Sequence, residues 1–242
     1  MTARESAVPV VMSECAGLWQ RTLLVDTDGA PDTTTDVRWL QGLTRFVDLR
    51  RPMPRPDYSE VRCAAELTGQ QRAWLRMQDG FAGVLTQSGD VFHWQRRIEL
   101  QAPGPFPDEG RMSRSGEMLV EIGVHADYFE HWVRSETPDT CWAMDLESPD
   151  GDRAILLRAG DRFGWAHLDS AGAVELSLGD VAHGEWVITD SCLPYREGHL
   201  LQPRWKTASE TGNTLFTSTI DAEGTQVTPQ WIVRYTEGNV IV

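Results

Sequence analysis

This chain has very little lysine: Lys206 stands alone among 22 basic residues, the rest of which are arginine, against 36 acidic residues. The formal net charge is therefore -14 at pH 7. Residues 1–100 hold 12 arginines and 13 acidic residues, which leaves 10 basic and 23 acidic residues for the remainder of the chain. Such an acidic surface repels phosphate groups. The composition thus argues against nucleic acid and anionic membranes as partners.

Long apolar runs and paired cysteine motifs are also missing. The opening MTARESAVPVVMSE holds only the apolar run AVPVVM, too short for a signal peptide, and no later stretch is long enough to cross a bilayer. Cys15, Cys63, Cys141 and Cys192 show no C-x-x-C or other metal-type spacing, so we expect them to stay reduced. These absences predict a cytoplasmic protein without a membrane partner.

Cofactor signatures are absent as well. The chain has no P-loop, no G-x-S-x-G, and no G-x-G-x-x-G between a strand and a helix. In LVEIGVHADYFEHW, a strand pair could bring Glu121, His125 and His131 together as ligands of a divalent metal. Their spacing matches neither H-x-H nor H-E-x-x-H, so histidines in the core or in solvent are the preferred interpretation. We expect neither a cofactor nor a metal.

What the chain does contain is alternation of apolar and polar residues with a period of two, interrupted by turn residues. The alternation predicts strands over 17–25, 35–41, 44–50, 80–87, 90–101, 117–124, 128–134, 140–146, 153–159 and 162–168. Further strands are predicted within 173–178, 184–190, 199–207, 213–220 and 226–237. Gly beside Asp or Ser in 86–91, 148–153 and 169–174 favours tight hairpins, so an antiparallel meander is expected.

The remaining segments predict one helix and two loops. Apolar positions follow a helical face over residues 64–78. The proline-rich stretches 50–56 and 102–110 are expected to be loops, because proline cannot donate to a sheet ladder. The fold class is therefore all-β: an antiparallel meander that forms a barrel, or two packed barrels, with one short helix.

The length suits one large domain or two small ones. We expect a flexible N-terminus over 1–14 and a single compact all-β unit over 15–242. Its possible halves are 15–136 and 137–242.

Aromatic residues recur with a polar or charged neighbour two positions away, and side chains two apart in a strand share a face. An aromatic wall with a few fixed polar groups is typical of a ligand pocket, although each face could instead be exposed, with arginine resting on tryptophan. If these groups are inside, arginines and carboxylates must pair, because breaking a buried ion pair costs on the order of 3 to 5 kcal/mol. The predicted ligand-binding residues are Trp19, Arg21, Trp39, Gln41, Asp48, Arg50, Trp94, Arg96, Glu130, Trp132 and Arg134.

Gly17-Leu18-Trp19 supplies a G-x-W motif on the first predicted strand. This motif resembles that of the calycin, or lipocalin-like, barrels, in which the tryptophan closes one end and a late arginine packs over it. The resemblance implies a barrel and gives that role to Arg234 in QWIVRYTE. The stretches V-x-W-L-Q, V-D-L-R-x-P and G-F-A-G, which begin at Val37, Val47 and Gly80, also look like an uncharacterised bacterial family of calycin-like proteins, which implies no activity.

The sequence is compatible with three functions. The leading hypothesis is a barrel that binds a small apolar or aromatic ligand with an anionic group, held by spare arginine donors. The second is a cofactor-independent lyase, isomerase or cyclase that uses the same cavity, with Glu121 or Glu130 as acid or base and Arg50 or Arg134 as anchor. The third is a protein-interaction module with a filled core, in which the polar faces lie outside.

Overall fold

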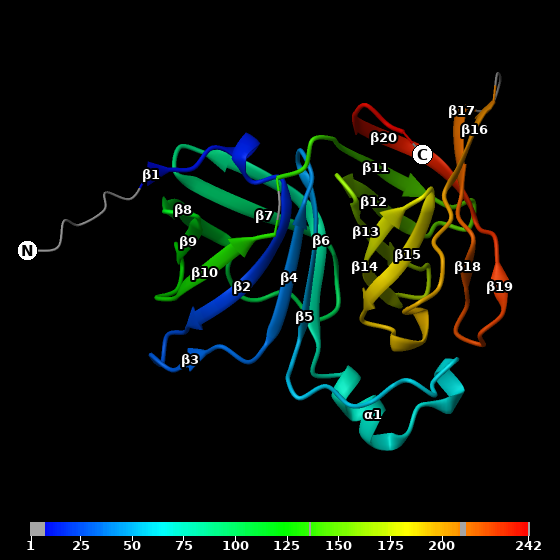
Figure 1. Cartoon of the computed structure of the whole chain (residues 1–242), viewed down its shortest axis with the longest axis horizontal. Coiled ribbons are helices and arrows are strands. Elements are labelled where there is room, and N and C mark those ends of the chain that lie inside the picture. Colours follow the sequence, from blue (N-terminus) through cyan, green and yellow to red (C-terminus); the bar gives the residue numbers. More distant parts are fainter. Residues whose placement is uncertain (1–7, 136, 209–211, 242) are drawn as a thin grey trace, which may run out of the picture.

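The computed structural model describes residues 8–135, 137–208 and 212–241, in which strands dominate and form two large antiparallel sheets (Figure 1). The predicted all-β class and antiparallel pairing are confirmed. The hairpins predicted at 86–91, 148–153 and 169–174 join neighbouring strands of one sheet. Among the described residues, no helix has the length and apolar character needed to span a membrane.

The first sheet is a closed barrel of eight strands. Its strands follow one another around the ring and the circle is completed by pairing of β8 with β9. In ring order they are β8 (Glu109–Ser115), β7 (Val91–Glu99), β6 (Asp79–Ser88), β5 (Arg45–Arg51), β4 (Asp36–Gln41), β2 (Gly17–Val25), β10 (Phe129–Arg134) and β9 (Met118–Gly123). The short strands β1 (Val8–Pro9) and β3 (Pro31–Asp32) pair with β8 and β2.

The second sheet also has eight strands and remains open. In order they are β15 (Glu185–Ser191), β14 (Val174–Ala182), β13 (Arg162–Leu168), β12 (Arg153–Ala159), β11 (Cys141–Glu147), β20 (Gln230–Gly238), β17 (Gly212–Phe216) and β16 (Arg204–Ala208). The small hairpin of β18 (Thr219–Ile220) and β19 (Gln226–Val227) lies beside it (Figure 1). The molecule thus combines one closed barrel with an open, half-barrel sheet.

Three apolar clusters follow from this arrangement. One fills the barrel and contains Trp19, Trp39 and Trp132, and another covers the inner face of the second sheet around Trp165 and Trp231. The third cluster, which we call the inter-sheet core, joins Leu40, Val47 and Leu49 of the barrel to Ile155, Leu157 and Leu176 of the second sheet. Strands β4 and β5 are therefore buried on both faces, one toward the barrel interior and one toward the second sheet.

The helix is shorter than predicted. A 3-10 turn covers Ala64–Glu66, and the α-helix α1 covers only Gly69–Leu75. The reason is a local cap: Leu67 and Thr68 are extended, and the Thr68 hydroxyl accepts a hydrogen bond from the Gln71 backbone N–H. Such a cap starts a helix at the following residue.

Strand β8, two 3-10 turns and the N-terminal segment differ from the sequence-based expectation or add to it. Strand β8 was not predicted, because its first residues fall in the proline-rich stretch 102–110 and its remainder lacks alternation. Two more 3-10 turns cover Met12–Glu14 and Pro194–Arg196. Of the N-terminus predicted to be flexible, residues 1–7 lie outside the described residues, whereas Val8–Pro9 pairs with β8.

Candidate functional site

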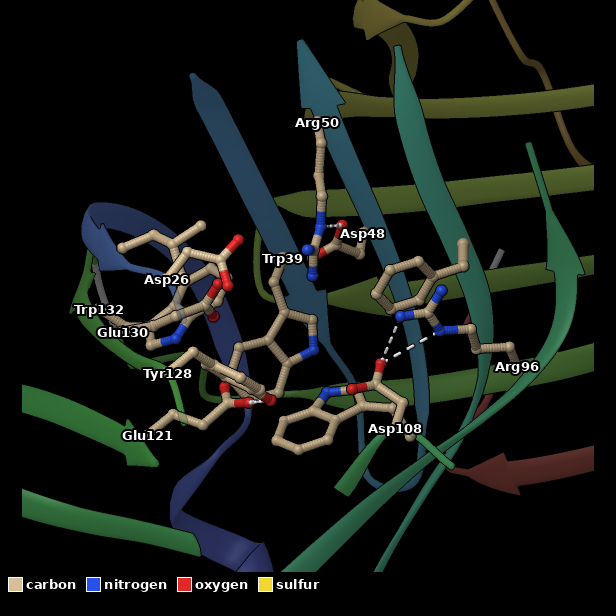
Figure 2. A pocket seen from close by; sticks show the side chains of 13 residues that line it. Asp26, Trp39, Asp48, Arg50, Arg96, Asp108, Glu121, Tyr128, Glu130 and Trp132 are labelled. Carbon is tan, nitrogen blue, oxygen red and sulfur yellow. Dashed lines mark hydrogen bonds and ion pairs between the residues drawn. The ribbon is translucent and has the colours of Figure 1, made fainter. Parts of the chain in front are cut away.

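A cavity of about 210 Å³ lies within the closed barrel, and Figure 2 shows the side chains that line it. Pockets for drug-sized ligands usually measure about 300 to 1,000 Å³, so this cavity suits a smaller molecule. Leu24 and the exposed Asp26 belong to the lining from the end of β2. The other lining side chains are five aromatic rings and six ionisable groups.

Tryptophans form the largest part of the aromatic wall. The ring of Trp39, on β4, lies 5.8 Å from that of Trp94 on β7 and 5.7 Å from that of Trp132 on β10, both in edge-to-face geometry. Phe81 on β6 and Tyr128 just before β10 complete the wall. Because neighbouring inward-facing positions come from different strands of one ring, barrel closure brings together residues that are far apart in the sequence.

Aspartate and arginine pair across one side of the cavity. Arg50 Nε donates to Asp48 Oδ1 at 2.7 Å, and both come from β5, two positions apart. Burial lowers the pKa of Arg50, but the charges of Asp48 and Glu130 outweigh burial and raise that pKa, so the guanidinium stays charged. Arg96 Nε and Nη2 donate to Asp108 Oδ2 at 3.1 and 2.8 Å. The Arg96 and Arg50 guanidinium carbons lie 3.6 and 4.7 Å from the ring centre of Phe81.

The carboxylate of Glu130 is held by an arginine that lies outside the cavity lining. Arg21 Nη1 donates to Glu130 Oε1 at 2.7 Å, and Arg21 Nη2 donates to Asp32 Oδ2 at 3.1 Å. Arg21 does not line the cavity, but it neutralises a group that does. Both Arg21 and Glu130 are buried, so removal of Arg21 would leave the charge of Glu130 uncompensated in the barrel wall.

Glu121 differs from the other carboxyl groups of the cavity. The Tyr128 hydroxyl donates to Glu121 Oε1 at 3.0 Å, and no ion pair of Glu121 is found among the residues that the structure describes. Burial raises the pKa of Glu121 well above its usual range, and the charges of Glu130 and Asp108 raise it further. The protonated acid is therefore favoured. The cavity combines an aromatic wall, arginine–carboxylate pairs and one buried carboxylic acid.

The structure brings together most of the residues predicted from the sequence. Those that line the cavity are Trp39, Asp48, Arg50, Trp94, Arg96, Glu121, Glu130 and Trp132. Trp19, Arg21, Gln41 and Arg134 do not line it. The ring of Trp19 stacks on that of Trp39 at 6.0 Å, and the Gln41 side-chain oxygen accepts from Trp39 Nε1 at 3.1 Å. Both residues therefore hold Trp39 in place without lining the cavity.

Arg134 occupies the place that the sequence analysis gave to Arg234. The Arg134 guanidinium carbon lies 5.1 Å from the ring centre of Trp19, and Arg134 Nη1 donates to the carbonyl oxygens of Glu14 and Ala16. Arg234 instead lies on β20 of the second sheet, where its Nε donates to Glu147 Oε2 at 2.7 Å. The expectation for Arg234 is wrong because the strand that pairs with β2 and places an arginine opposite Trp19 is β10, and not the last strand β20. The enzyme hypothesis named Arg134 as one possible anchor for the ligand. Arg134 does not line the cavity, so it cannot have that role.

Five lining residues were not predicted. Tyr128 shares a face with Glu130 and Trp132, and Phe81 is inward on β6, so alternation could have found both. Asp108 lies in a predicted loop, and Leu24 and Asp26 follow a register shift in the pairing of β2 with β10. Such a bulge inverts the parity that sequence reasoning uses. No sequence signal marks these last three.

The histidines considered as metal ligands lie apart. His125 Nε2 is 2.8 Å from Glu109 Oε2, and the ring of His131 contacts that of Phe129. Glu121 faces the barrel cavity instead. Within the described ranges, no group of three or more acidic, histidine or cysteine side chains has the geometry of a metal site.

Comparisons with known proteins bear on the fold. No protein-family model matches the sequence, and no curated protein matches it at a significant level. A solved structure, the crystal structure of an uncharacterized protein from Saccharomyces cerevisiae, is similar with a TM-score of 0.55. The match covers 92% of this chain and 98% of that chain at 12% sequence identity. At this identity the likeness shows the fold alone.

Proposed function

We propose that this protein binds a small molecule with a flat apolar or aromatic body inside the closed barrel. The observation that carries the proposal is the convergence of Trp39, Trp94 and Trp132 on a cavity whose two arginines are held in fixed pairs with carboxylates. Aromatic faces supply most of the contact area in such sites, and a few oriented polar groups supply specificity. The lipocalin-like interpretation of the barrel fits this function and stays part of the proposal.

Mass spectrometry of the intact protein tests the proposal. The protein is incubated with a small-molecule extract of cells and spectra are recorded under native and denaturing conditions. A stoichiometric added mass that disappears on denaturation is the expected result. Leu24 lines the cavity, so Leu24→Trp should fill it and abolish the added mass.

Leu23→Trp is the matched control. Leu23 precedes Leu24 on β2, pairs with His131, and does not belong to the cavity lining. The added mass should therefore persist in Leu23→Trp. A bare polypeptide mass in the unmodified protein, or the same added mass in Leu24→Trp, would reject binding in this cavity.

One observation also favours an enzyme. Glu121 is a buried acid with a raised pKa beside the Tyr128 hydroxyl and the Glu130 carboxylate, which is a usable arrangement for proton transfer. A lyase, isomerase or cyclase reaction would require turnover of the bound molecule. Turnover that is lost in Glu121→Gln while binding persists would favour this alternative. The filled-core interaction module is disfavoured, because the barrel has a cavity and Asp48 faces it.

A further inference from the structure

We infer that the ligand of the barrel carries a positive charge, and that it exchanges with the proton of Glu121 when it binds. This inference rests on the proposed ligand-binding function and concerns the chemical class of the ligand. The class is an organic cation such as an ammonium compound with an apolar or aromatic body. It differs from the anionic ligand that the sequence alone favoured, so the two expectations can be compared directly.

The pairing of charges in the barrel wall is the first argument. Arg50 pairs with Asp48, Arg96 with Asp108, and Arg21 with Glu130. An anion that bound to one of these arginines would compete with a carboxylate already in place. The donors on which an anionic ligand depends are therefore largely engaged by the protein itself.

The missing ion pair of Glu121 also favours a cationic ligand. Five carboxyl groups line the cavity: Asp26 is exposed, and Asp48, Asp108 and Glu130 are paired with arginines. Glu121 is buried and has no ion pair among the described residues. A carboxyl group in this position is neutral while protonated and becomes a counter-ion when a cation arrives. The Tyr128 hydroxyl, at 3.0 Å from Oε1, can donate to the carboxylate in both situations.

The aromatic wall is the third argument. Trp39, Trp94 and Trp132 line the cavity from three strands, and Figure 2 labels Trp39 and Trp132 among the lining side chains. Cations are attracted to the face of tryptophan more strongly than to any other side-chain ring, and quaternary ammonium groups are commonly held in aromatic cages. In the part of the chain that the structure describes, arginines stack on Phe81 and on Trp19, and none stacks on these three rings.

Arg50 and Arg96 oppose a cation, because both line the cavity, and Arg96 is held against Asp108 at 2.8 Å (Figure 2). The guanidinium of Arg50 enters the cavity. Its charge is held against Asp48 at 2.7 Å and lies in the field of Glu130. The local balance is therefore set by Glu121. The charged or titratable groups that act most strongly on Glu121 are Tyr128, Glu130 of β10, Asp108 before β8, and Arg50 of β5. Asp26, Asp48 and Arg96 line the same cavity.

The exchange predicts a defined pH dependence. A permanent cation that binds the ionised form of Glu121 displaces one proton to solvent, so no net charge enters the barrel. Below the pKa of Glu121, the affinity should rise up to tenfold for each pH unit, and above it the affinity should level off. A quaternary ammonium probe has no titration of its own, so the slope reports on the protein.

Isothermal titration calorimetry with three probes tests the inference: benzyltrimethylammonium, benzyl alcohol and benzoate. The cation should bind at least about tenfold more tightly than the other two, which is about 1.4 kcal/mol. Titrations in buffers of different ionisation enthalpy should show release of about one proton for each cation bound. Glu121→Gln should abolish the pH slope and weaken the cation about tenfold at the pH of tightest binding.

Glu117→Gln is the control, because Glu117 is exposed in the same β8–β9 hairpin and the change removes the same formal charge. It should retain the slope. A pH-independent affinity of the unchanged protein, a slope that persists in Glu121→Gln, or tighter binding of benzoate would overturn the inference. Benzoate or benzyl alcohol that binds more tightly than the cation, and is lost in Leu24→Trp, would keep the proposed ligand-binding function and reject only the cation. If none of the three probes binds, the inference of a cationic ligand is also rejected. The native mass spectra described above then decide whether the barrel binds a ligand.

Discussion

At the level of single residues, the carboxyl group of Glu121 makes the stability of the folded protein depend on pH even without a ligand. Because burial raises its pKa, the folded protein holds this proton more tightly than the unfolded chain, whose glutamate titrates near 4.5. The contribution of Glu121 to stability is complete below that ordinary value and is lost as the pH rises toward the raised one. The loss amounts to up to about 1.4 kcal/mol for each pH unit in that interval.

We therefore expect Glu121→Gln to have a flatter dependence of the free energy of unfolding on pH than the unchanged protein. Urea unfolding followed by tryptophan fluorescence between about pH 5 and pH 8 measures the difference. The glutamine oxygen can still accept from the Tyr128 hydroxyl, so the fold should be kept. Parallel curves for the two proteins would show that Glu121 ionises normally in the folded state.

The cysteines also differ from one another at this scale. Burial raises the pKa of Cys15 and of Cys192 to about 12 and that of Cys141 to about 11, and the thiolate is the reactive form. Cys63 is half-buried. Ellman's reagent should therefore modify one thiol quickly in the folded protein, and Cys63→Ser should remove that reaction. Quick modification of a second thiol in the native protein would contradict this account.

At the scale of elements, the arginines of β5 point to two different places. Arg50 faces the barrel cavity, whereas Arg45 leaves the barrel and reaches the second sheet. Arg45 Nε and Nη2 donate to the two carboxylate oxygens of Asp145 on β11, at 3.0 and 2.6 Å, and Arg45 lies 3.8 Å from the ring centre of Tyr235 on β20. This bidentate geometry is the strongest form of an arginine–carboxylate pair.

Asp145→Ala should therefore destabilise the protein by about 3 kcal/mol, since it removes the main partner of a buried guanidinium. The cost stays at the lower end of the usual range because Glu237 remains 3.5 Å from Arg45 Nη1. The shift of the urea midpoint at constant slope measures it.

Glu147→Ala is the comparison for the same pair of strands. Glu147 on β11 pairs with Arg234 on β20, but both side chains are exposed, so its loss should cost less than about 1 kcal/mol. Equal destabilisation by the two substitutions would mean that burial of the Arg45 pair contributes little to its strength.

At the scale of the whole molecule, the barrel and the second sheet share the inter-sheet core. Val47 packs so closely against β13 that a Cβ atom on Gly164 would lie 2.9 Å from Val47 Cγ2. The side chains of Leu40 and Leu49 point the same way, so the outer face of β4 and β5 would be an exposed apolar surface without the second sheet. Each sheet therefore stabilises the other.

We expect the two sheets to unfold in one cooperative transition. Leu49→Ala should lower the stability of both by about 2 to 5 kcal/mol, because Leu49 is buried in the inter-sheet core. Hydrogen exchange of amides in β2 and in β13, measured during urea unfolding, compares the two sheets. Leu43→Ala, at an exposed position, should change neither by more than about 0.5 kcal/mol. Separate midpoints for the two sheets would show that they fold independently.

Local chemistry made much of this fold predictable. The alternation predicted β2, β12 and β13 with the bounds that the structure shows, because each follows a period of two between turn residues. The predicted range of helix α1 was too long, because the Thr68 cap starts the helix at Gly69 although the apolar periodicity begins earlier. Strand β8 was missed because its inward and outward positions do not alternate in polarity.

For the candidate site, alternation placed Trp39, Asp48, Arg50 and Trp94 among the inward groups, and the structure gathers them at one cavity. It could not place Leu24, because a bulge reverses the parity of β2 beyond Arg21. It also could not separate Arg134 from Arg234, since both follow tryptophans on amphipathic strands. Those assignments depend on which strands are neighbours.

Composition and the pattern of residues one to four positions apart are enough to predict an all-β, acidic protein with alternating strands. The closure of eight strands into a ring, the cover on both faces of β4 and β5, and the contact of Asp108 with Arg96 depend instead on how distant segments of the chain pack together. The same packing leaves Glu121 as the buried carboxyl group of the cavity that has no ion pair among the described residues. Charge pairing and cavity shape depend on distances between side chains, and ring closure sets these distances.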